Sequence, residues 1–184
     1  MALEREIKLR FDSADQAREQ VLALGATPLL GRRLQEDLLF DTEDERLRLQ
    51  RSTLRVRSEG GKALLTFKGP VIPAAIKIRE EHETVVSDAA TLQTILEELG
   101  LHVWFRYEKY REEFTIDDAV IAIDETPVGV FVEIEGSEEA IRTIASALGK
   151  KSADYITDSY RFLFLKHRDA NGLDGANMVF GHLR

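Results

Sequence analysis

Hydrophobic and charged residues alternate along several segments of the chain, a pattern typical of β-strands whose two faces meet different surroundings. In residues 4–11, every even position is charged and every odd position after Arg5 is apolar. The same alternation predicts eight strands in all, at residues 4–11, 35–40, 53–59, 62–68, 76–86, 104–114, 118–124 and 130–136. Gly60-Gly61 separates two of them and indicates a two-residue hairpin turn, and residues 127–129 form a second turn.

Helices are expected between or after these strands, where hydrophobic residues change to a helical spacing and capping residues appear. Residues 13–25 begin at Ser13 and end at Gly25. Further helices are predicted at residues 88–99, 138–148 and, from a weaker pattern, 158–168. The last segment, residues 169–184, is rich in Gly and Asn and is expected to be an irregular tail.

The polar strand faces carry charged residues almost exclusively, with very little Ser, Thr, Asn or Gln. Like charges also recur two residues apart, and on one face they repel unless an opposite charge lies between them. The pairs are Glu4/Glu6, Arg55/Arg57, Glu81/Glu83, Lys109/Arg111 and Glu133/Glu135. A sheet with one face in water would show the same alternation, but it gives no reason for this repeated pairing of like charges.

A closed barrel with the charged faces inward accounts for the pairing. The predicted fold is therefore α+β: a closed eight-stranded antiparallel β-barrel with a polar lumen and the helices packed on its outside. A barrel of about eight strands encloses room for side chains or one small ligand. Paired Glu residues favour a hard cation, and paired Arg or Lys residues favour phosphate oxygens. A ligand that carries both metal and several phosphates would satisfy both sets.

Composition narrows the class of ligand. The net charge of −8 and the pI of about 5.1 argue against a sequence-independent nucleic-acid binder. A small anion in a local basic pocket stays compatible with them. The absence of Cys excludes disulfides, thiolate metal sites and Cys nucleophiles. No apolar run approaches the about 20 residues of a membrane helix, and the N-terminus is charged and alternating rather than a signal peptide, so we expect a cytoplasmic protein without a membrane partner.

The chain opens with the charged motif Glu4-Arg5-Glu6-Ile7-Lys8. This motif resembles the opening Glu-x-Glu-x-Lys of the CYTH superfamily, the triphosphate tunnel metalloenzymes. Matching segments follow in the same order: Leu54-Arg55-Val56-Arg57, Thr66-Phe67-Lys68-Gly69-Pro70, residues 77–83, Lys109-Tyr110-Arg111, Asp124-Glu125, residues 129–135 and Ser159-Tyr160. Val128 departs from the Leu that is common before the Gly. The likeness covers about residues 1–166, which implies a tunnel domain at residues 1–168 followed by the tail, residues 169–184.

The resemblance implies a role for each lumen residue. Divalent metal would be held by Glu4, Glu6, Glu133 and Glu135. Substrate phosphates would be bound by Lys8, Arg55, Arg57, Lys68, Arg79, Lys109 and Arg111. The catalytic candidates are Glu81 and Glu83, which would assist a second metal or orient the attacking group. A site made only of carboxylates favours Mg²⁺ or Mn²⁺ over Zn²⁺.

Three functions stay open: metal-dependent hydrolysis of a triphosphate, a class IV-type adenylate cyclase that converts ATP to cyclic AMP and pyrophosphate, and a non-catalytic polyphosphate binder. The carboxylates argue against the third. Hydrolysis is favoured over cyclisation because no aromatic or Asn/Gln cluster falls on the inward faces. Thiamine triphosphate is disfavoured as the substrate because it calls for an aromatic surface to stack on, and Trp104 is predicted to point outward. The substrate is expected to be a small-molecule triphosphate.

Several charged residues carry two interpretations. Asp37 and Asp124 either belong to the site or only neutralise neighbouring Arg and Lys side chains. Lys77 is inward by alternation but close to the loop after Pro73. Arg5, Arg32 and Arg33 either mark a homodimer surface or are simply solvated, and solvation is the preferred interpretation.

Overall fold

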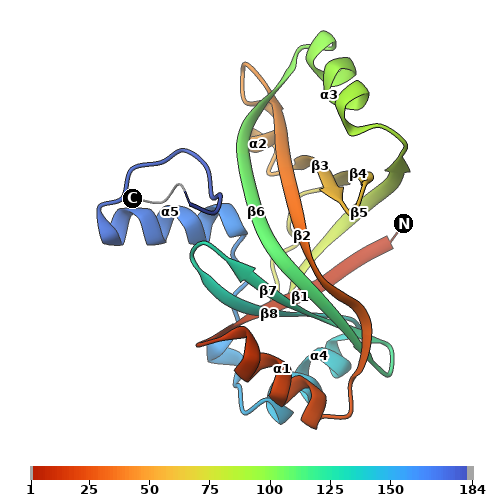
Figure 1. Cartoon of the computed structure of the whole chain (residues 1–184), viewed down its shortest axis with the longest axis vertical. Helices are drawn as coiled ribbons and strands as arrows, with labels where there is room; N and C mark the ends of the chain where they lie inside the picture. The colour runs from red at the N-terminus through yellow and green to blue at the C-terminus, as the bar shows by residue number, and fades with distance from the viewer. Residues whose placement is uncertain (1, 182–184) are drawn as a thin grey trace.

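The computed structural model describes residues 2–181, and its centre is a closed barrel of eight antiparallel strands (Figure 1). Around the barrel the order is β1-β5-β4-β3-β2-β6-β7-β8, and β8 pairs with β1 to close it. The strands are β1 (Ala2–Phe11), β2 (Thr27–Thr42), β3 (Thr53–Glu59), β4 (Lys62–Lys68), β5 (Lys77–Val86), β6 (Leu101–Ile116), β7 (Ala119–Thr126) and β8 (Gly129–Glu135). The predicted fold class is confirmed.

The predicted helices are present and lie outside the barrel. They are α1 (Ala14–Ala23), α3 (Ala89–Glu98), α4 (Glu138–Ala147) and α5 (Tyr160–Asn171), joined by the short α2 (Arg46–Leu49) and the 3₁₀ turn η1 (Ser152–Asp154). The long helices begin at Ser13, Asp88, Ser137 and Ser159, whose side-chain oxygens accept backbone N–H groups of the first turn. Among residues 2–181, no helix has both the length and the apolarity that crossing a membrane requires.

The outward strand faces form the hydrophobic core with the helices. At one end of the barrel, α1 and α4 cover β1, β7 and β8 (Figure 1), where Ile7, Ile121 and Ile134 are fully buried. At the opposite end α3 places Leu96 against Phe40 and Val56. Because the apolar faces bury themselves outward in this way, the charged faces of the same strands turn into the lumen, as the alternation predicts.

The C-terminal part of the chain covers a stretch of β6 that β7 does not reach. Pairing between β6 and β7 begins only at Tyr110. Next to it, the Met178 N–H donates to the Arg106 carbonyl at 3.0 Å and the Glu108 N–H donates to the Met178 carbonyl at 2.9 Å. Phe180 packs on Tyr110, with ring centroids 5.3 Å apart. Residues 172–181 thus occupy a strand edge that would otherwise expose unpaired backbone groups.

Candidate functional site

One cavity of about 1280 Å³ runs through the barrel and is lined by every site residue that the sequence predicts. These are Glu4, Glu6, Lys8, Arg55, Arg57, Lys68, Arg79, Glu81, Glu83, Lys109, Arg111, Glu133 and Glu135. They come from six strands, β1, β3, β4, β5, β6 and β8. The alternation of the sequence therefore brings opposite charges from distant segments into a single lumen.

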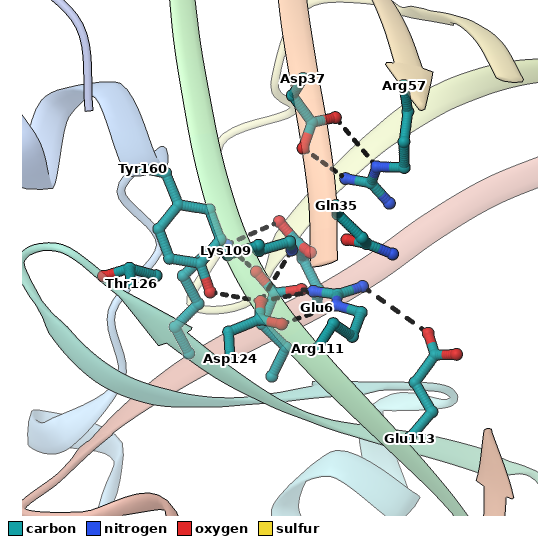
Figure 2. Close-up of polar contacts among 12 residues, drawn as sticks. Glu6, Gln35, Asp37, Arg57, Lys109, Arg111, Glu113, Asp124, Thr126 and Tyr160 are labelled. Atoms are coloured by element: carbon teal, nitrogen blue, oxygen red, sulfur yellow. Dashed lines mark hydrogen bonds and ion pairs between the residues drawn. The ribbon is translucent and has the colours of Figure 1, made fainter. Parts of the chain in front are cut away.

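Two buried aspartates hold the basic side of the cavity. Asp37 on β2 accepts hydrogen bonds from Arg57, at 2.9 Å from Nε and 3.4 Å from a terminal nitrogen (Figure 2). Asp124 on β7 accepts from Lys109 at 2.8 Å and from Arg111 at 2.7 and 2.6 Å. Burial by itself would raise the pKa of both carboxyl groups, but the neighbouring cations outweigh it and lower both pKa values. Asp37 and Asp124 are therefore counter-ions that fix the basic side chains.

Arg55 is the basic residue of this wall that is least satisfied. Its Nε is buried and has no hydrogen-bond partner among the described residues, although Asp37 Oδ1 lies 3.4 Å away as an ion-pair contact. Its terminal nitrogen donates to Thr66 Oγ1 at 3.1 Å. A buried donor without an acceptor is unfavourable, so an anionic ligand that accepts a hydrogen bond from this atom would be stabilised here.

Two tyrosines in this wall were not predicted as site residues. The Tyr160 hydroxyl donates to Asp124 Oδ2 at 2.6 Å (Figure 2), and the Nζ atoms of Lys8 and Lys109 lie 5.2 and 4.9 Å from the centre of its ring. Tyr107 lines the cavity beside Arg55. Burial and the nearby Arg111 lower the pKa of Lys109 to about 8, despite its contact with Asp124. The one available signal for Tyr160 was the match of Ser159-Tyr160 to the family pattern.

The acidic side of the cavity is built from β1, β5 and β8. Glu4 Oε1 lies 2.6 Å from Lys68 Nζ, and Glu4 Oε2 lies 3.0 Å from Arg79 Nε. Glu6 Oε1 contacts Lys8 at 3.1 Å. Lys8 Nζ also lies 3.1 Å from Glu133, which forms a second ion pair with Arg111. Each of these three glutamates therefore has a cationic neighbour in the ligand-free protein.

Lys77 lies on the same side and resolves one of the two-way interpretations. Its Nζ contacts Glu6 Oε1 at 2.5 Å, so the side chain points into the lumen. Burial and the charge of Lys8 lower the pKa of Lys77 to about 8 even though Glu6 opposes that change. The alternation of β5 is thus kept up to its first residue, next to the loop.

Glu135 and Glu81 differ from the other carboxylates. Glu135 has no ion pair within residues 2–181, and its side chain is exposed. Partial desolvation and the charges of Glu4 and Glu6 raise its pKa to about 7. The pKa of Glu81 is also raised, by desolvation and Glu4, although Lys68 lies 2.8 Å away. This corner of the cavity holds more negative charge than its cations neutralise.

The donor set of this corner fits a hard divalent cation. Every candidate ligand is a carboxylate oxygen, and Glu135 lies near the like charges of Glu4 and Glu6, which an added cation would offset. The carboxylates are turned toward lysines and arginines, and in the part of the chain that the structure describes no three acidic or His side chains already form a metal cluster. The residues present therefore have the chemistry for Mg²⁺ or Mn²⁺.

The two catalytic candidates lie at the β4–β5 side of the cavity. Glu83 accepts a hydrogen bond from Thr66 Oγ1 at 2.7 Å and lies 3.5 Å from Arg55. Glu81 contacts Lys68 instead. Both carboxylates line the cavity, and desolvation and the charge of Glu4 raise the pKa of Glu81, the direction that favours a general base.

The prediction that Trp104 points away from the site is wrong. Leu39 of β2 pairs with Phe105 and the next residue, Phe40, pairs with Val103, so the register skips Trp104. A register shift of this kind changes the direction of a side chain, and Trp104 lines one end of the cavity.

Arg33, which we expected to be solvated, forms ion pairs with Glu59 and Glu113. Arg32 is exposed and forms an ion pair with Glu125.

Comparison with known proteins agrees with this geometry. The model of the CYTH domain family matches residues 2–160. A protein named "putative adenylate cyclase" from Methanocaldococcus jannaschii is 33% identical over 136 residues, which cover 73% of this chain and 77% of that protein.

Solved structures share the fold. A structure from Vibrio parahaemolyticus, also named "putative adenylate cyclase", has a TM-score of 0.78 at 22% identity. The match covers 89% of this chain and 98% of that chain. An adenylyl cyclase homologue from Hippeastrum, described as having a dominant triphosphatase activity, has a TM-score of 0.66 at 19% identity and covers 90% and 96% of the two chains. At these identities the likeness concerns the fold.

Proposed function

The chain belongs to the CYTH family, and we propose that it is a divalent-metal-dependent triphosphatase that hydrolyses inorganic tripolyphosphate or an organic triphosphate in its tunnel. The observation that carries the proposal is the convergence of the basic residues and the carboxylates on one cavity. The unpartnered Nε of Arg55 adds a buried donor on the phosphate-binding side. The triphosphatase activity described for the Hippeastrum relative agrees with this choice.

The phosphates would be bound by the basic wall. Seven basic side chains supply hydrogen-bond donors from several directions. They are Arg55 and Arg57 from β3, Lys109 and Arg111 from β6, and Lys8, Lys68 and Arg79. Asp37 and Asp124 keep the guanidinium groups in place, so little reorganisation is needed when the anion enters. In this low-dielectric lumen, charge-assisted hydrogen bonds are stronger than on the surface.

The acidic corner would serve the chemistry. Glu4, Glu6, Glu133 and Glu135 would hold Mg²⁺ or Mn²⁺, which when bound neutralises charge on the phosphate oxygens. Glu81, or Glu83 beside it, accepts a proton from a water molecule as its oxygen attacks phosphorus. The bond from phosphorus to the bridging oxygen then breaks, and the leaving phosphate carries away the electron pair with support from the lysines.

A class IV-type adenylate cyclase is the second candidate, and Trp104 is the observation that favours it. The ring lies at the cavity end where the organic part of a nucleotide would extend. However, two guanidinium groups already cover it, at 4.4 and 4.7 Å from the ring centre. Cyclisation needs the 3′-hydroxyl held in line with the α-phosphorus, and a ring covered in this way offers less stacking surface for a base.

The deciding assay incubates the protein with tripolyphosphate and, separately, with ATP, each with Mg²⁺ or Mn²⁺, and resolves the products. We expect orthophosphate, released fastest from tripolyphosphate, and loss of activity in excess chelator. Glu133→Gln should be inactive, whereas the exposed Arg32→Gln should match the wild type. Cyclic AMP and pyrophosphate as the main products from ATP would replace the hydrolase with the cyclase, and full activity in chelator would reject the metal.

A further inference from the structure

The cavity continues past the triphosphate clamp to a mouth built by α2, Trp104 and the start of α5. Its lining there includes Arg48, Arg51, Trp104, Arg161 and Phe162. The whole cavity, about 1280 Å³, is larger than the roughly 300–1,000 Å³ that is usual for a small-molecule site. There is room for a substrate group beyond three phosphates.

A buried carboxylate builds the first side of this mouth. Asp41 is fully buried and accepts the backbone N–H groups of Leu47 at 2.8 Å and Arg48 at 3.1 Å. It also accepts Arg48 Nε at 3.0 Å. Arg48 forms a second ion pair with Glu45 at 3.0 Å. The guanidinium of Arg48 is thus held in place and its charge is compensated within the protein.

Trp104 connects α2 to α5, because its ring contacts an arginine from each helix. The Arg48 guanidinium lies 4.4 Å from the centre of the indole ring, and the Arg161 guanidinium lies 4.7 Å from the same ring. Cation–π contacts of this kind hold an arginine by its flat face and leave the N–H groups at its edge free. Trp104 is therefore a platform that positions Arg161 at the cavity wall.

Arg161 differs from Arg48 because no carboxylate of the described residues contacts it. Within residues 2–181 it makes no ion pair and no side-chain hydrogen bond. Partial burial and the positive charges of Arg48 and Arg168 lower its pKa, although the charge of Glu45 opposes this change. Asp158, the acidic residue of this wall, lies 3.2 Å from Lys166 and is paired there. The exposed Arg51 adds further positive charge to the mouth.

We propose that Arg161, positioned on Trp104, is a binding residue for an anionic group beyond the three phosphates of the clamp. Its free fork of N–H donors matches two oxygens of one phosphate. The preferred substrates would then be linear polyphosphates of four or more units, or triphosphates whose organic part carries its own phosphate. This specificity rests on the proposed function, because the same tunnel must first hold the triphosphate.

The test is titration calorimetry in excess chelator, with tripolyphosphate and tetrapolyphosphate as ligands. We expect the wild type to bind tetrapolyphosphate about tenfold more tightly, the effect of one added charge-assisted contact. Arg161→Gln should bring the two affinities within about twofold and leave tripolyphosphate binding unchanged. Arg168→Gln removes a positive charge from the same helix outside the cavity wall, and it should keep the tenfold preference.

Two further arms complete the design. ATP against adenosine 3′-phosphate 5′-triphosphate reports whether the extra phosphate can come from the organic part. Arg161→Lys keeps the charge but loses the planar fork, so a reduced preference in this variant supports the proposal even if Arg161→Gln unfolds.

Three outcomes would overturn the inference: no chain-length preference in the wild type, an equal loss for both ligands in Arg161→Gln, or an equal effect of Arg168→Gln. These outcomes leave the triphosphatase intact, provided that hydrolysis of tripolyphosphate is measured on the same preparation. Absence of both binding and hydrolysis of tripolyphosphate would instead reject the proposed function, and the mouth subsite with it.

Discussion

The two sides of the tunnel solve the problem of buried charge differently. On the basic side, Asp37 and Asp124 have almost no exposure and each contacts at least two cations. On the acidic side, Glu4, Glu6 and Glu81 share their lysines and arginines, and Glu135 has none within the described chain. The pKa values are lowered for both aspartates and for Glu4, Glu6 and Glu133, which cations contact, and raised for Glu81 and Glu135.

The direction of the pKa shift distinguishes carboxylates that stabilise the tunnel from carboxylates that are free to bind a ligand. A carboxylate whose pKa is lowered is stabilised as an anion by the folded protein, so its loss leaves buried cations unpaired. A carboxylate whose pKa is raised is unfavourable as an anion, so its loss costs the fold little. Substitution of Asp124 and substitution of Glu135 should therefore have opposite effects on stability and activity.

The largest effect is expected for Asp124→Asn. The substitution leaves Lys109 and Arg111 without their shared carboxylate, and breaking a buried pair costs about 3–5 kcal/mol. Urea unfolding should show this loss, whereas Glu135→Gln should be no less stable than the wild type. Equal destabilisation by the two variants would remove the distinction between the two sides.

The next effect is expected on catalysis for Glu135→Gln. Loss of one charged metal ligand should lower kcat with Mg²⁺ by about 100-fold, while the melting temperature stays close to that of the wild type. Glu138→Gln on α4 is the matched control, since Glu138 is exposed and, among residues 2–181, forms an ion pair with Arg142 alone. A fully active, normally folded Glu135→Gln would show that the acidic corner does not serve the reaction.

A smaller effect is expected on binding for Arg57→Gln. Hydrogen bonds to charged groups contribute about 1.5–3 kcal/mol, so the affinity for tripolyphosphate should fall by roughly 10- to 100-fold. Arg32→Gln gives the control because Arg32 is exposed outside the cavity. Calorimetry that finds the same loss in both variants would attribute binding to overall charge rather than to the basic wall.

The smallest effect concerns pH. The pKa of Asp37 is lowered, so its stabilisation is complete above the unfolded value of about 3.9 and is lost as pH falls through the folded pKa. The pKa of Glu135 is raised to about 7, above the unfolded value of about 4.3, so stability falls as pH rises between these two values. Urea unfolding in chelator should show that Glu135→Gln lacks this fall, whereas Glu138→Gln keeps it.

The regular strands explain how much of the site could be predicted. In β1, β3, β5 and β8 the pleat continues without interruption, so position in the sequence determined which side chains face the lumen. The prediction failed at Trp104, where β2 and β6 shift register. It also shortened β2, whose first residues are exposed on both faces and therefore show no alternation.

Pairing between distant charges was beyond the sequence. Alternation places Asp37 and Asp124 in the lumen but does not say that Arg57 and Arg111 will turn toward them. The same limit applies to Arg33, whose partners Glu59 and Glu113 lie on other strands. Residues 172–181 contain no strand pattern, because they follow a free backbone edge of β6 that exists only after folding.

Closure of the barrel by β1 and β8 also determines when the tunnel can exist. Glu6 lies opposite Glu135 in the backbone register of β1 and β8, and Lys8 forms an ion pair with Glu133. The first strand therefore makes these contacts with residues more than a hundred positions later in the sequence. Contacts so distant in sequence make folding slow, because loop entropy must be lost before they form. During synthesis, a nascent chain that lacks β8 carries Lys8 and the other lumen charges without their partners. We therefore expect the tunnel to be among the last parts of this protein to form.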